Sequence, residues 1–417
     1  MSPLLSHRMR RWMTPLLPAA LIIAACGDDD DATAGDDDTE DDGNGSAGES
    51  VDADPELLEL ALGTTDTEAI PQVILAAVAR AGEDASEERL EVAMECWQKA
   101  QCQTGTGGDL SVALADGFGE NVWREVTRME FILQALTYPE IGEIRYTTAQ
   151  GDTQKAISDF QSLIAQDVDI IATFPDAGEA LLPTAREATR QGIVVVPYIA
   201  GLSEEAGEDY LTYVAEDLCE LGNNFAEVLN DEIGEGKVAF LGGTPGNPLS
   251  EAWQSCEEES LSAELDIVGR ADTNWTREGT LQAMSGFLSE HPDLAGVSYE
   301  YADGFLGGVR AYEAADMPLN LVLTLRTDEV GVFCEWREAD NPDFKIFHSS
   351  GGSFQSRIAL TAAMMQLNGE SVDERIVVPA EMRQVDEESC REDIPGEAPI
   401  STLIPDNVMQ EMYGSGS

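Results

Sequence analysis

The segment 146–201 has the pattern strand, helix, strand, helix, strand, and it constrains the fold more than any other part of the chain. Short apolar, β-branched runs at 144–148, 169–174 and 193–199 are typical of parallel strands that are covered on both faces. Between them, apolar residues recur at helical spacing. Because parallel strands joined in this way cross over right-handedly, the loops at their carboxyl ends form the natural crevice for a ligand.

The two helices of this unit differ in how clearly they begin. Asp152 stands at the expected N-cap of the first helix. In the second, Asp176 and Glu179 have the spacing of a capping pair, whereas Pro183 predicts that the helix bends or begins near that residue. We therefore interpret Asp152 and Asp176 as helix caps first and as ligand groups second.

The N-terminus predicts export. Arg8, Arg10 and Arg11 precede an apolar run at 13–25, which is too short for a permanent membrane span and is typical of a secretory signal. The run ends in the letters IAACG, which resemble a bacterial lipobox, so we expect a signal peptide at 1–25 and a lipid on Cys26. An ordinary signal with a chance cysteine is the alternative.

Residues 26–54 are rich in Asp, Gly, Ser and Thr and contain no aromatic residue, which predicts a disordered, extended tether. Its thirteen acidic residues are only part of the net charge of −57, so the folded body is itself acidic. This charge disfavours nucleic acid and anionic lipid as partners, and we expect membrane contact through the lipid anchor only. A solvated surface suited to an external medium explains the acidity; a cationic ligand is the alternative.

Apart from Cys26, the chain has six cysteines, an even number that indicates disulfides in an exported protein. Sequence alone allows fifteen pairings. Our hypothesis is that neighbours pair in order, as Cys96–Cys102, Cys219–Cys256 and Cys334–Cys390. No His or Cys cluster has the spacing of a zinc site, and we expect neither a metal nor a cofactor.

Strand and helix patterns continue to alternate beyond the central unit, which predicts an α/β fold of two Rossmann-like lobes with parallel sheets. Residues 55–108 show helical periodicity and form a predicted helical N-terminal extension. The expected divisions are an N-terminal lobe at 109–214 plus about 350–379, a C-terminal lobe at 215–349 plus about 380–392, and a C-terminal extension at 393–417 of unassigned packing.

Several motifs carry a family resemblance through their order and spacing. They are QGD at 150–152 and VDII at 168–171 in the first lobe, then ADTNWTR at 271–277, HPD at 291–293 and GGVRAYEAA at 307–315 in the second. From about 110 to about 384 the chain resembles the ribose and galactose-type (type 1) branch of the periplasmic binding protein superfamily, the substrate-binding proteins of ABC importers. The resemblance implies two lobes joined by three crossing strands, closing by hinge motion around a small-molecule ligand that is delivered to a membrane permease. We expect a monomer.

The same resemblance suggests ligand contacts. In the family, aromatic residues sandwich a sugar ring, and Trp123 and Trp275 occupy matching positions; the alternative for each is a core residue. Polar candidates at matching positions are Asp116, Glu120, Asn121, Gln150, Asp176, Tyr301 and Asp303. Four further candidates are Tyr198, Glu251, Arg326 and His348.

Four positions depart from the family pattern. Ile199 and Ala200 replace an Asp-Arg pair that clamps sugar hydroxyls, Arg326 replaces an acid, and Glu251 replaces an arginine. We expect Arg326 to form an ion pair with Glu251 or Asp303, because an unpaired buried charge is costly. A polyol, a modified sugar or another small polar metabolite therefore stands beside a plain sugar as the expected ligand.

Three functions compete. The first is a lipid-anchored, extracytoplasmic receptor of an ABC importer, and the second is a ligand-sensing module that docks on a membrane receptor or kinase. The third is a secreted enzyme, which the sequence disfavours because His348 is its single candidate site imidazole and no Gly-x-Ser-x-Gly motif is present. A DNA-binding helix pair and a basic face are also absent from the sequence, which excludes a repressor of related fold.

Overall fold

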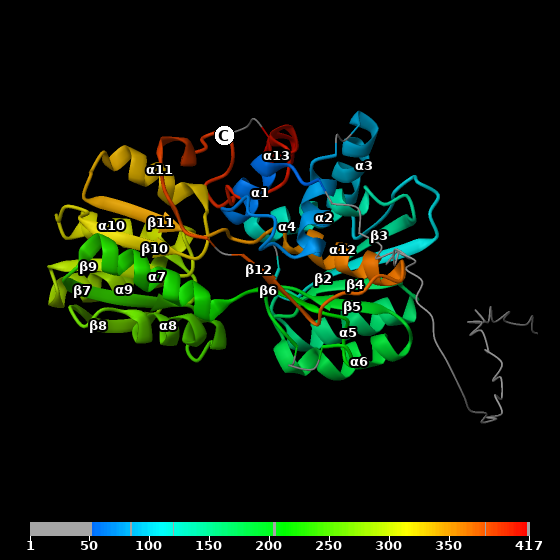
Figure 1. The fold of residues 1–417 in the computed structure, drawn as a ribbon, viewed down its shortest axis with the longest axis horizontal. Helices are drawn as coiled ribbons and strands as arrows, with labels where there is room; N and C mark the ends of the chain where they lie inside the picture. The colour runs from blue at the N-terminus through cyan, green and yellow to red at the C-terminus, as the bar shows by residue number, and fades with distance from the viewer. Residues whose placement is uncertain (1–51, 84–85, 120, 203–205, 380, 415–417) are drawn as a thin grey trace, which may run out of the picture. The chain divides into compact units, whose positions relative to one another are not determined.

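The computed structural model describes residues 52–83, 86–119, 121–202, 206–379 and 381–414. The predicted signal peptide, Cys26, most of the tether and Glu120 lie outside these residues. In the part of the chain that is described, no helix is long and apolar enough to cross a membrane. The fold is mixed α/β in two lobes, as predicted (Figure 1).

The first lobe is built on a five-stranded sheet in the order β1-β3-β2-β4-β5. Four strands are parallel, and the short edge strand β1 runs antiparallel to β3. The strands are β1 Gln101–Gln103, β2 Leu110–Asp116, β3 Ile141–Thr148, β4 Ile170–Phe174 and β5 Val194–Pro197. The three strands predicted within and beside segment 146–201 are thereby confirmed.

Helices cover both faces of this sheet, because successive strand residues point to opposite sides. Ala113 and Ile171 are buried with α5 and α6 on one face, while Val112 and Ile170 are buried with α4 and α12 on the other. The helices are α4 Val122–Ala135, α5 Thr153–Ala165, α6 Leu182–Arg190 and α12 Gln355–Leu367. Burial on both faces explains why these strands read as continuous apolar runs.

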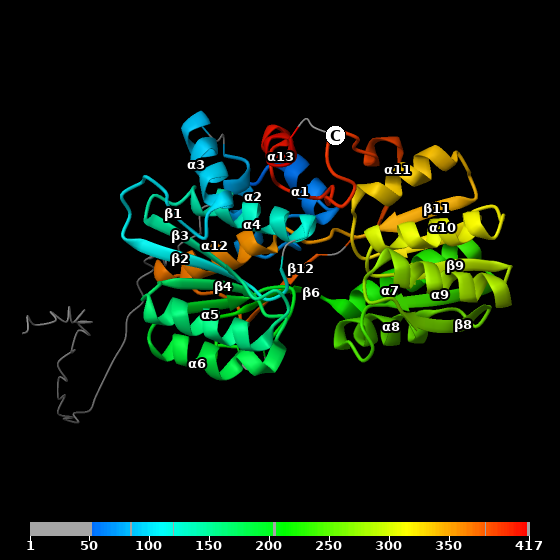
Figure 2. The same ribbon diagram turned by 180° about the vertical axis from the view of Figure 1, so that it is seen from behind.

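Within the predicted N-terminal extension, residues 55–108, the structure has the short strand β1 and three helices. The helices are α1 Pro55–Leu62, α2 Gln72–Ala81 and α3 Glu87–Gln98. α2 packs on α4 and α12, and α3 packs on α4, so the extension adds a layer to the first lobe (Figure 2). A disulfide from Cys96 to Cys102 joins α3 to β1.

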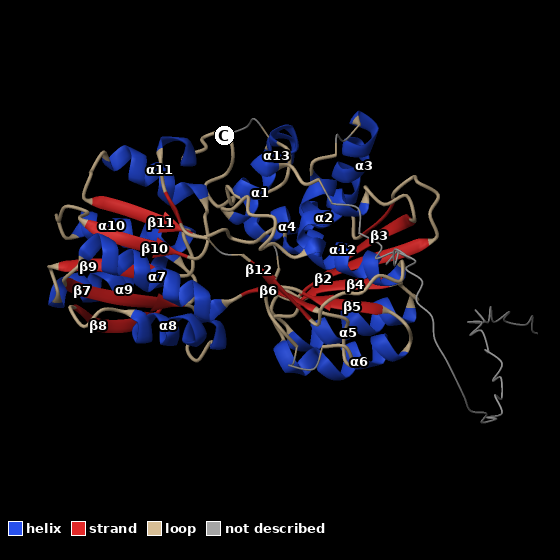
Figure 3. Cartoon of the chain, in the orientation of Figure 1, coloured by secondary structure: helices blue, strands red, loops and turns tan. Residues whose placement is uncertain are grey.

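The second lobe has a six-stranded sheet in the order β13-β11-β10-β9-β7-β8, in which only β13 is antiparallel to its neighbour. Its strands are β7 Gly236–Gly242, β8 Leu265–Asp272, β9 Leu294–Tyr299, β10 Leu321–Leu325, β11 Phe344–His348 and β13 Arg383–Gln384. Its helices are α7 Leu218–Ile233, α8 Pro248–Ser260, α9 Arg277–Glu290, α10 Leu306–Ala314 and α11 Val330–Ala339. α7 and α8 pack against each other, as do α9 and α10 (Figure 3).

The chain passes between the lobes beside a small parallel sheet of β6 Tyr213–Glu216 and β12 Arg375–Val378. β6 runs into α7, and the loop after β12 runs into β13. A third passage leads from β11 through residues 349–354 to α12. After β13, a 3-10 turn (η3, Glu387–Ser389) precedes the C-terminal extension predicted from residue 393, which contains the helix α13 Asp406–Tyr413.

Two local predictions have different outcomes. Asp152 caps α5 by accepting the backbone N–H of Lys155, as expected. The capping interpretation of Asp176 is wrong, because a 3-10 turn at Gly178–Leu181 precedes α6 and has no side-chain cap. α6 begins beside Pro183, which lies in its first turn, where the missing N–H of proline is harmless.

The three disulfides join the cysteines in chain order, as hypothesised.

Candidate functional site

A buried arginine joins two carboxylates at the strand ends of the first lobe. Arg124, in the first turn of α4, donates from Nη1 to Asp116 Oδ1 at 2.8 Å and from Nη2 to Asp176 Oδ1 at 3.0 Å. Asp116 ends β2 and Asp176 follows β4, so adjacent strands place the two acids side by side. Asn121 caps α4 by accepting the N–H of Arg124 at 2.8 Å, which fixes the turn that carries the guanidinium.

One guanidinium between two carboxylates leaves this group with a formal surplus of negative charge. Burial raises the pKa of Asp116, and the positive charge of Arg124 opposes that rise. Sequence reasoning placed Asp116 and Asp176 at the site but missed Arg124. The available signal was its position, one residue beyond Trp123 at the start of the helix that follows the first long strand.

Aromatic rings surround the guanidinium. Arg124 lies with its Cζ 3.5 Å from the ring centroid of Phe174, which in turn lies 6.0 Å from the ring of Trp123 and 5.8 Å from that of Tyr198. The indole N–H of Trp123 donates to the backbone oxygen of Gly351 at 3.2 Å. Phe118, in the loop after β2, is exposed over 53% of its surface. Phe174 and Phe118 are further residues of this region that the sequence prediction did not include.

Strained backbone marks several strand ends. Gln150 follows β3 and Ile199 follows β5, and both have positive φ, at 54° and 64°. In the second lobe, Asn274 and Trp275 follow β8 with φ of 54° and 50°. A positive φ is costly for residues other than glycine, most of all for the β-branched Ile199. Such strained residues concentrate at ligand sites. Two predicted residues, Gln150 and Trp275, therefore occupy positions that the surrounding fold must hold in place.

In the second lobe, a buried glutamate orients the predicted Trp275. Glu300, directly after β9, accepts the indole N–H of Trp275 on Oε1 at 2.6 Å and the hydroxyl of Ser250 at 2.7 Å. Its Oε2 accepts the indole N–H of Trp253 at 2.6 Å. Burial raises the pKa of Glu300, although these donors oppose the rise. A Cβ on Gly243 would lie 2.1 Å from the ring of Trp275, so only glycine leaves room for the indole.

A second arginine group lies at the ends of β8 and β9. Arg277 Nε donates to Asp303 Oδ2 at 3.0 Å, and its Nη2 donates to Glu397 Oε1 at 3.0 Å. Nearby Glu329 is buried, and its Oε1 has no hydrogen-bond partner among the described residues. Burial, with smaller contributions from the charges of Asp328 and Asp303, raises the pKa of Glu329 to about 8.

Arg326 forms the structural ion pair that was expected, but with a different partner. Its Nε and Nη2 donate to the two carboxylate oxygens of Glu216 at 2.7 and 3.0 Å, and Gln355 donates to the same carboxylate at 2.7 Å. The predicted partners were Glu251 or Asp303, which was wrong. Glu216 ends β6, where the chain enters the second lobe, so the ion pair lies at a crossing between the lobes.

The remaining predicted residues lie in varied surroundings. Tyr198 is buried, and its hydroxyl has no partner within the described residues; Tyr301 donates to Asp303 at 3.5 Å. Glu251 is exposed in the first turn of α8. His348 is only 2% exposed, with its ring 4.8 Å from that of Phe333, and burial lowers its pKa to about 4. The structure thus groups Asp116, Trp123, Asp176 and Tyr198 around Arg124, and it groups Trp275 with Glu300.

Two parallel-sheet lobes, each with an aromatic ring beside a buried acid at its strand ends, define a two-lobed α/β protein of the ligand-binding class. The family model of the periplasmic binding protein domain matches residues 112–371, and the chain belongs to this family.

Individual relatives agree with this assignment. The ribose import binding protein of Bacillus subtilis is 29% identical over 168 residues, which is 40% of this chain and 54% of that protein. The chain spans about half the length of the curated relatives it matches. The structure of a periplasmic ribose ABC transporter from Conexibacter woesei is 26% identical, covers 68% of this chain and 94% of that one, and superposes with a TM-score of 0.60. The fructose-binding periplasmic domain of a hybrid two-component system, at 17% identity, covers 67% of this chain and 91% of that one with a TM-score of 0.57, and shows the shared fold.

Proposed function

We propose that this protein is an extracytoplasmic solute-binding protein that closes on an uncharged, polyhydroxylated ligand, a sugar or a polyol, and delivers it to an ABC permease. The observation that carries the proposal is the same in both lobes: an indole held by a hydrogen bond lies beside a buried carboxylate. Trp123 lies beside the group of Arg124 with the buried Asp116 and the exposed Asp176, and Trp275 lies beside the buried Glu300. An aromatic face suits the C–H face of a sugar, and carboxylates accept hydrogen bonds from its hydroxyls.

The charge balance supports an uncharged ligand over an anion. Each arginine of the candidate site already binds carboxylates, namely Arg124, Arg277 and Arg326. The carboxylate of Glu300 accepts hydrogen bonds only from neutral groups, the hydroxyl of Ser250 and two indole N–H groups. Acidic side chains therefore outnumber cationic ones at these strand ends. An anionic ligand would therefore meet repulsion without a free cation from this set to bind it.

Anchoring and delivery rest on the N-terminal pattern and on the family. A lipid on Cys26 and an extended tether would hold the binding lobes near the membrane that contains the permease. The runner-up function is a ligand-sensing module, and the observation that favours it is the fold shared with the periplasmic domain of a two-component system. Loss of ligand uptake in cells that lack the protein supports the importer, whereas loss of a transcriptional response with normal uptake supports the sensor.

A thermal-shift screen tests the ligand class. We expect sugars and polyols to raise the unfolding midpoint, because a ligand that binds only the folded state stabilises it, and we expect sugar acids and sugar phosphates to leave it unchanged. For the ligand that is found, Trp123→Ala and Trp275→Ala should each weaken binding by about tenfold or more in calorimetric titration. The matched control is Trp336→Phe. The indole N–H of Trp336 donates to the backbone of Phe344 within the second lobe. A midpoint that rises only with anions, or undiminished binding in both alanine variants, contradicts the proposal.

A further inference from the structure

The C-terminal segment at 391–405, which we call the C-terminal strap, lies outside the part of the chain that the family model matches. It begins beside Cys390, which is bonded to Cys334 on α11 of the second lobe. The strap then runs along the start of α11. The N–H of Gly331 donates to Gly396 at 2.8 Å, and the N–H of Val330 donates to Ala398 at 3.0 Å. Together with the ion pair between Glu397 and Arg277, these bonds attach the first part of the strap to the second lobe.

The middle of the strap binds Asp328, in the loop between β10 and α11, and both the strap and Asp328 contact the passage from β11 to α12. The N–H groups of Ile400 and Ser401 donate to the backbone and the side chain of Asp328, at 3.2 and 2.9 Å. The other carboxylate oxygen of Asp328 accepts the N–H of Gly351 at 3.1 Å, and Ser401 and Ser350 share a hydroxyl contact at 3.0 Å. Both Ser350 and Gly351 belong to the passage from β11 to α12.

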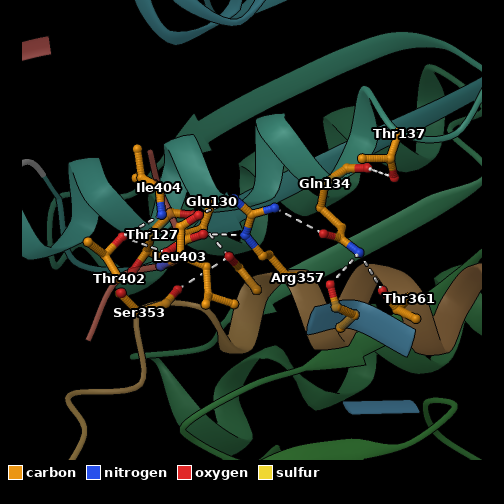
Figure 4. A network of polar contacts seen from close by, with 12 residues as sticks. Thr127, Glu130, Gln134, Thr137, Ser353, Arg357, Thr361, Thr402, Leu403 and Ile404 are labelled. Atoms are coloured by element: carbon orange, nitrogen blue, oxygen red, sulfur yellow. Dashed lines mark hydrogen bonds and ion pairs between the residues drawn. The ribbon is translucent and has the colours of Figure 1, made fainter. Parts of the chain in front are cut away.

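The last part of the strap is attached to the first lobe. Thr402 Oγ1 and the N–H of Leu403 donate to Glu130 on α4 at 2.6 and 2.7 Å, and Glu130 is in turn paired with Arg357 on α12 (Figure 4). The helix that follows, α13, buries Val408, Met409 and Met412. The ring of its last residue, Tyr413, lies 6.2 Å from that of Trp97 on α3.

We infer that the C-terminal strap is a fourth connection between the lobes and that it limits how far they separate when the protein opens. Members of this family open and close by hinge motion about their crossing segments. Even if the bonds to Asp328 break, the four peptide units between Ala398 and Thr402 span at most about 14 Å when fully extended. Wider separation requires either loss of the buried contacts at Glu130 or detachment of the strap from α11. Through Glu397, the same segment also holds Arg277 beside Asp303 at the candidate ligand site.

The test lengthens the strap and then cuts it in the folded, full-length, ligand-free protein. A seven-residue recognition sequence for a site-specific protease is inserted between Pro399 and Ile400. The matched control carries the same insertion between Gly234 and Glu235, which are exposed in one loop of the second lobe. Spin labels on Gln161→Cys (α5) and Glu259→Cys (α8), both exposed, report the distance between the lobes by electron paramagnetic resonance.

The inference predicts that the distance between the two labels has a short upper limit in the parent protein. After the insertion this maximum distance should increase by more than about 5 Å, and after cleavage it should increase further. Cleavage follows folding, so a folding defect of the variant cannot produce the last increase. Unchanged distances in the inserted and the cleaved protein overturn the inference, and so does an equal increase in the control. The measurement uses no ligand, so its outcome is independent of the proposed function.

Discussion

The carboxylate of Glu130 on α4 and the guanidinium of Arg357 on α12 form an ion pair whose side chains are 0% and 2% exposed. Glu130 also accepts hydrogen bonds from Thr402 and Leu403, and Arg357 donates to Gln134 at 3.0 Å (Figure 4). A buried charge is tolerated when an opposite charge and hydrogen bonds satisfy all of its polar atoms. Removal of one charge of the pair leaves the other buried and uncompensated.

Arg357→Met should therefore lower the free energy of unfolding by about 3–5 kcal/mol, because the carboxylate of Glu130 stays buried without its cation. Urea unfolding followed by circular dichroism measures this loss. The control is Lys345→Met, which removes a pair with Glu232 whose side chains are 37% and 29% exposed and should cost less than about 1 kcal/mol. Similar small losses in both variants would show that the buried pair contributes little.

Gly243→Ala should weaken ligand binding, because the added Cβ overlaps the ring of Trp275 and displaces the indole from Glu300. We expect a tenfold or greater loss of affinity for the ligand found by the thermal-shift screen, as is typical when a central aromatic contact is lost, which is about 1.4 kcal/mol. Gly286→Ala is the matched control, since its Cβ meets no atom within 4 Å in the middle of α9. That control should bind normally and gain about 0.5–1 kcal/mol of stability. Normal binding by Gly243→Ala would contradict the role given to the indole.

Arg124→Met should destabilise the first lobe, and the loss should grow with pH. Without the arginine, burial and the charge of Asp176 both raise the pKa of Asp116 with no cation to oppose them. A carboxyl whose folded-state pKa lies above its unfolded value stabilises the protein below the unfolded pKa and loses that contribution as pH rises through the folded pKa. The deficit in melting temperature relative to the parent should thus be larger at pH 8 than at pH 5. A deficit that does not depend on pH would mean that packing against Phe174, and not charge, explains the effect of Arg124.

Glu329→Gln should flatten the pH dependence of stability between about pH 4.5 and 8. Burial raises the pKa of Glu329 from 4.5 to about 8, so the folded state holds a proton that the unfolded state releases in this range. The parent therefore loses stability as pH rises through the window, by up to about 1.4 kcal/mol per pH unit from this group. Glutamine keeps the acceptor for the N–H of Asp303 but has no proton to lose.

Chemical denaturation at pH 5 and pH 8 measures the effect of Glu329→Gln. The variant should exceed the parent in stability at pH 8 and approach it at pH 5. Glu227→Gln, exposed on α7, is the control and should follow the parent at both values. A parallel pH dependence of Glu329→Gln and the parent would show that this carboxyl does not titrate as inferred.

Secondary structure and lobe architecture were predictable from the sequence, because they depend on features that the chain carries locally. The apolar runs at 169–174 and 193–199 report burial of a strand on both faces, and Asp152 reports a helix start, whichever partners surround them. The even number of cysteines indicated disulfides, but the tertiary structure decided which cysteines pair, and it joins partners that are six, 37 and 56 residues apart. The family resemblance added candidate ligand contacts at the strand ends, namely Asp116, Trp123 and Trp275.

The partners of the buried charges were decided only by the tertiary structure. Arg326 pairs with Glu216 across 110 residues, Arg357 pairs with Glu130 across 227, and Arg277 binds Glu397 across 120. A sequence pattern tells which face of an element is buried, but the partner of a charge depends on the order of strands in the sheet and on which segment crosses there. Trp275 shows the division well: the motif at 271–277 placed the indole at a strand end, and packing beside Gly243 and Glu300 gave it its orientation.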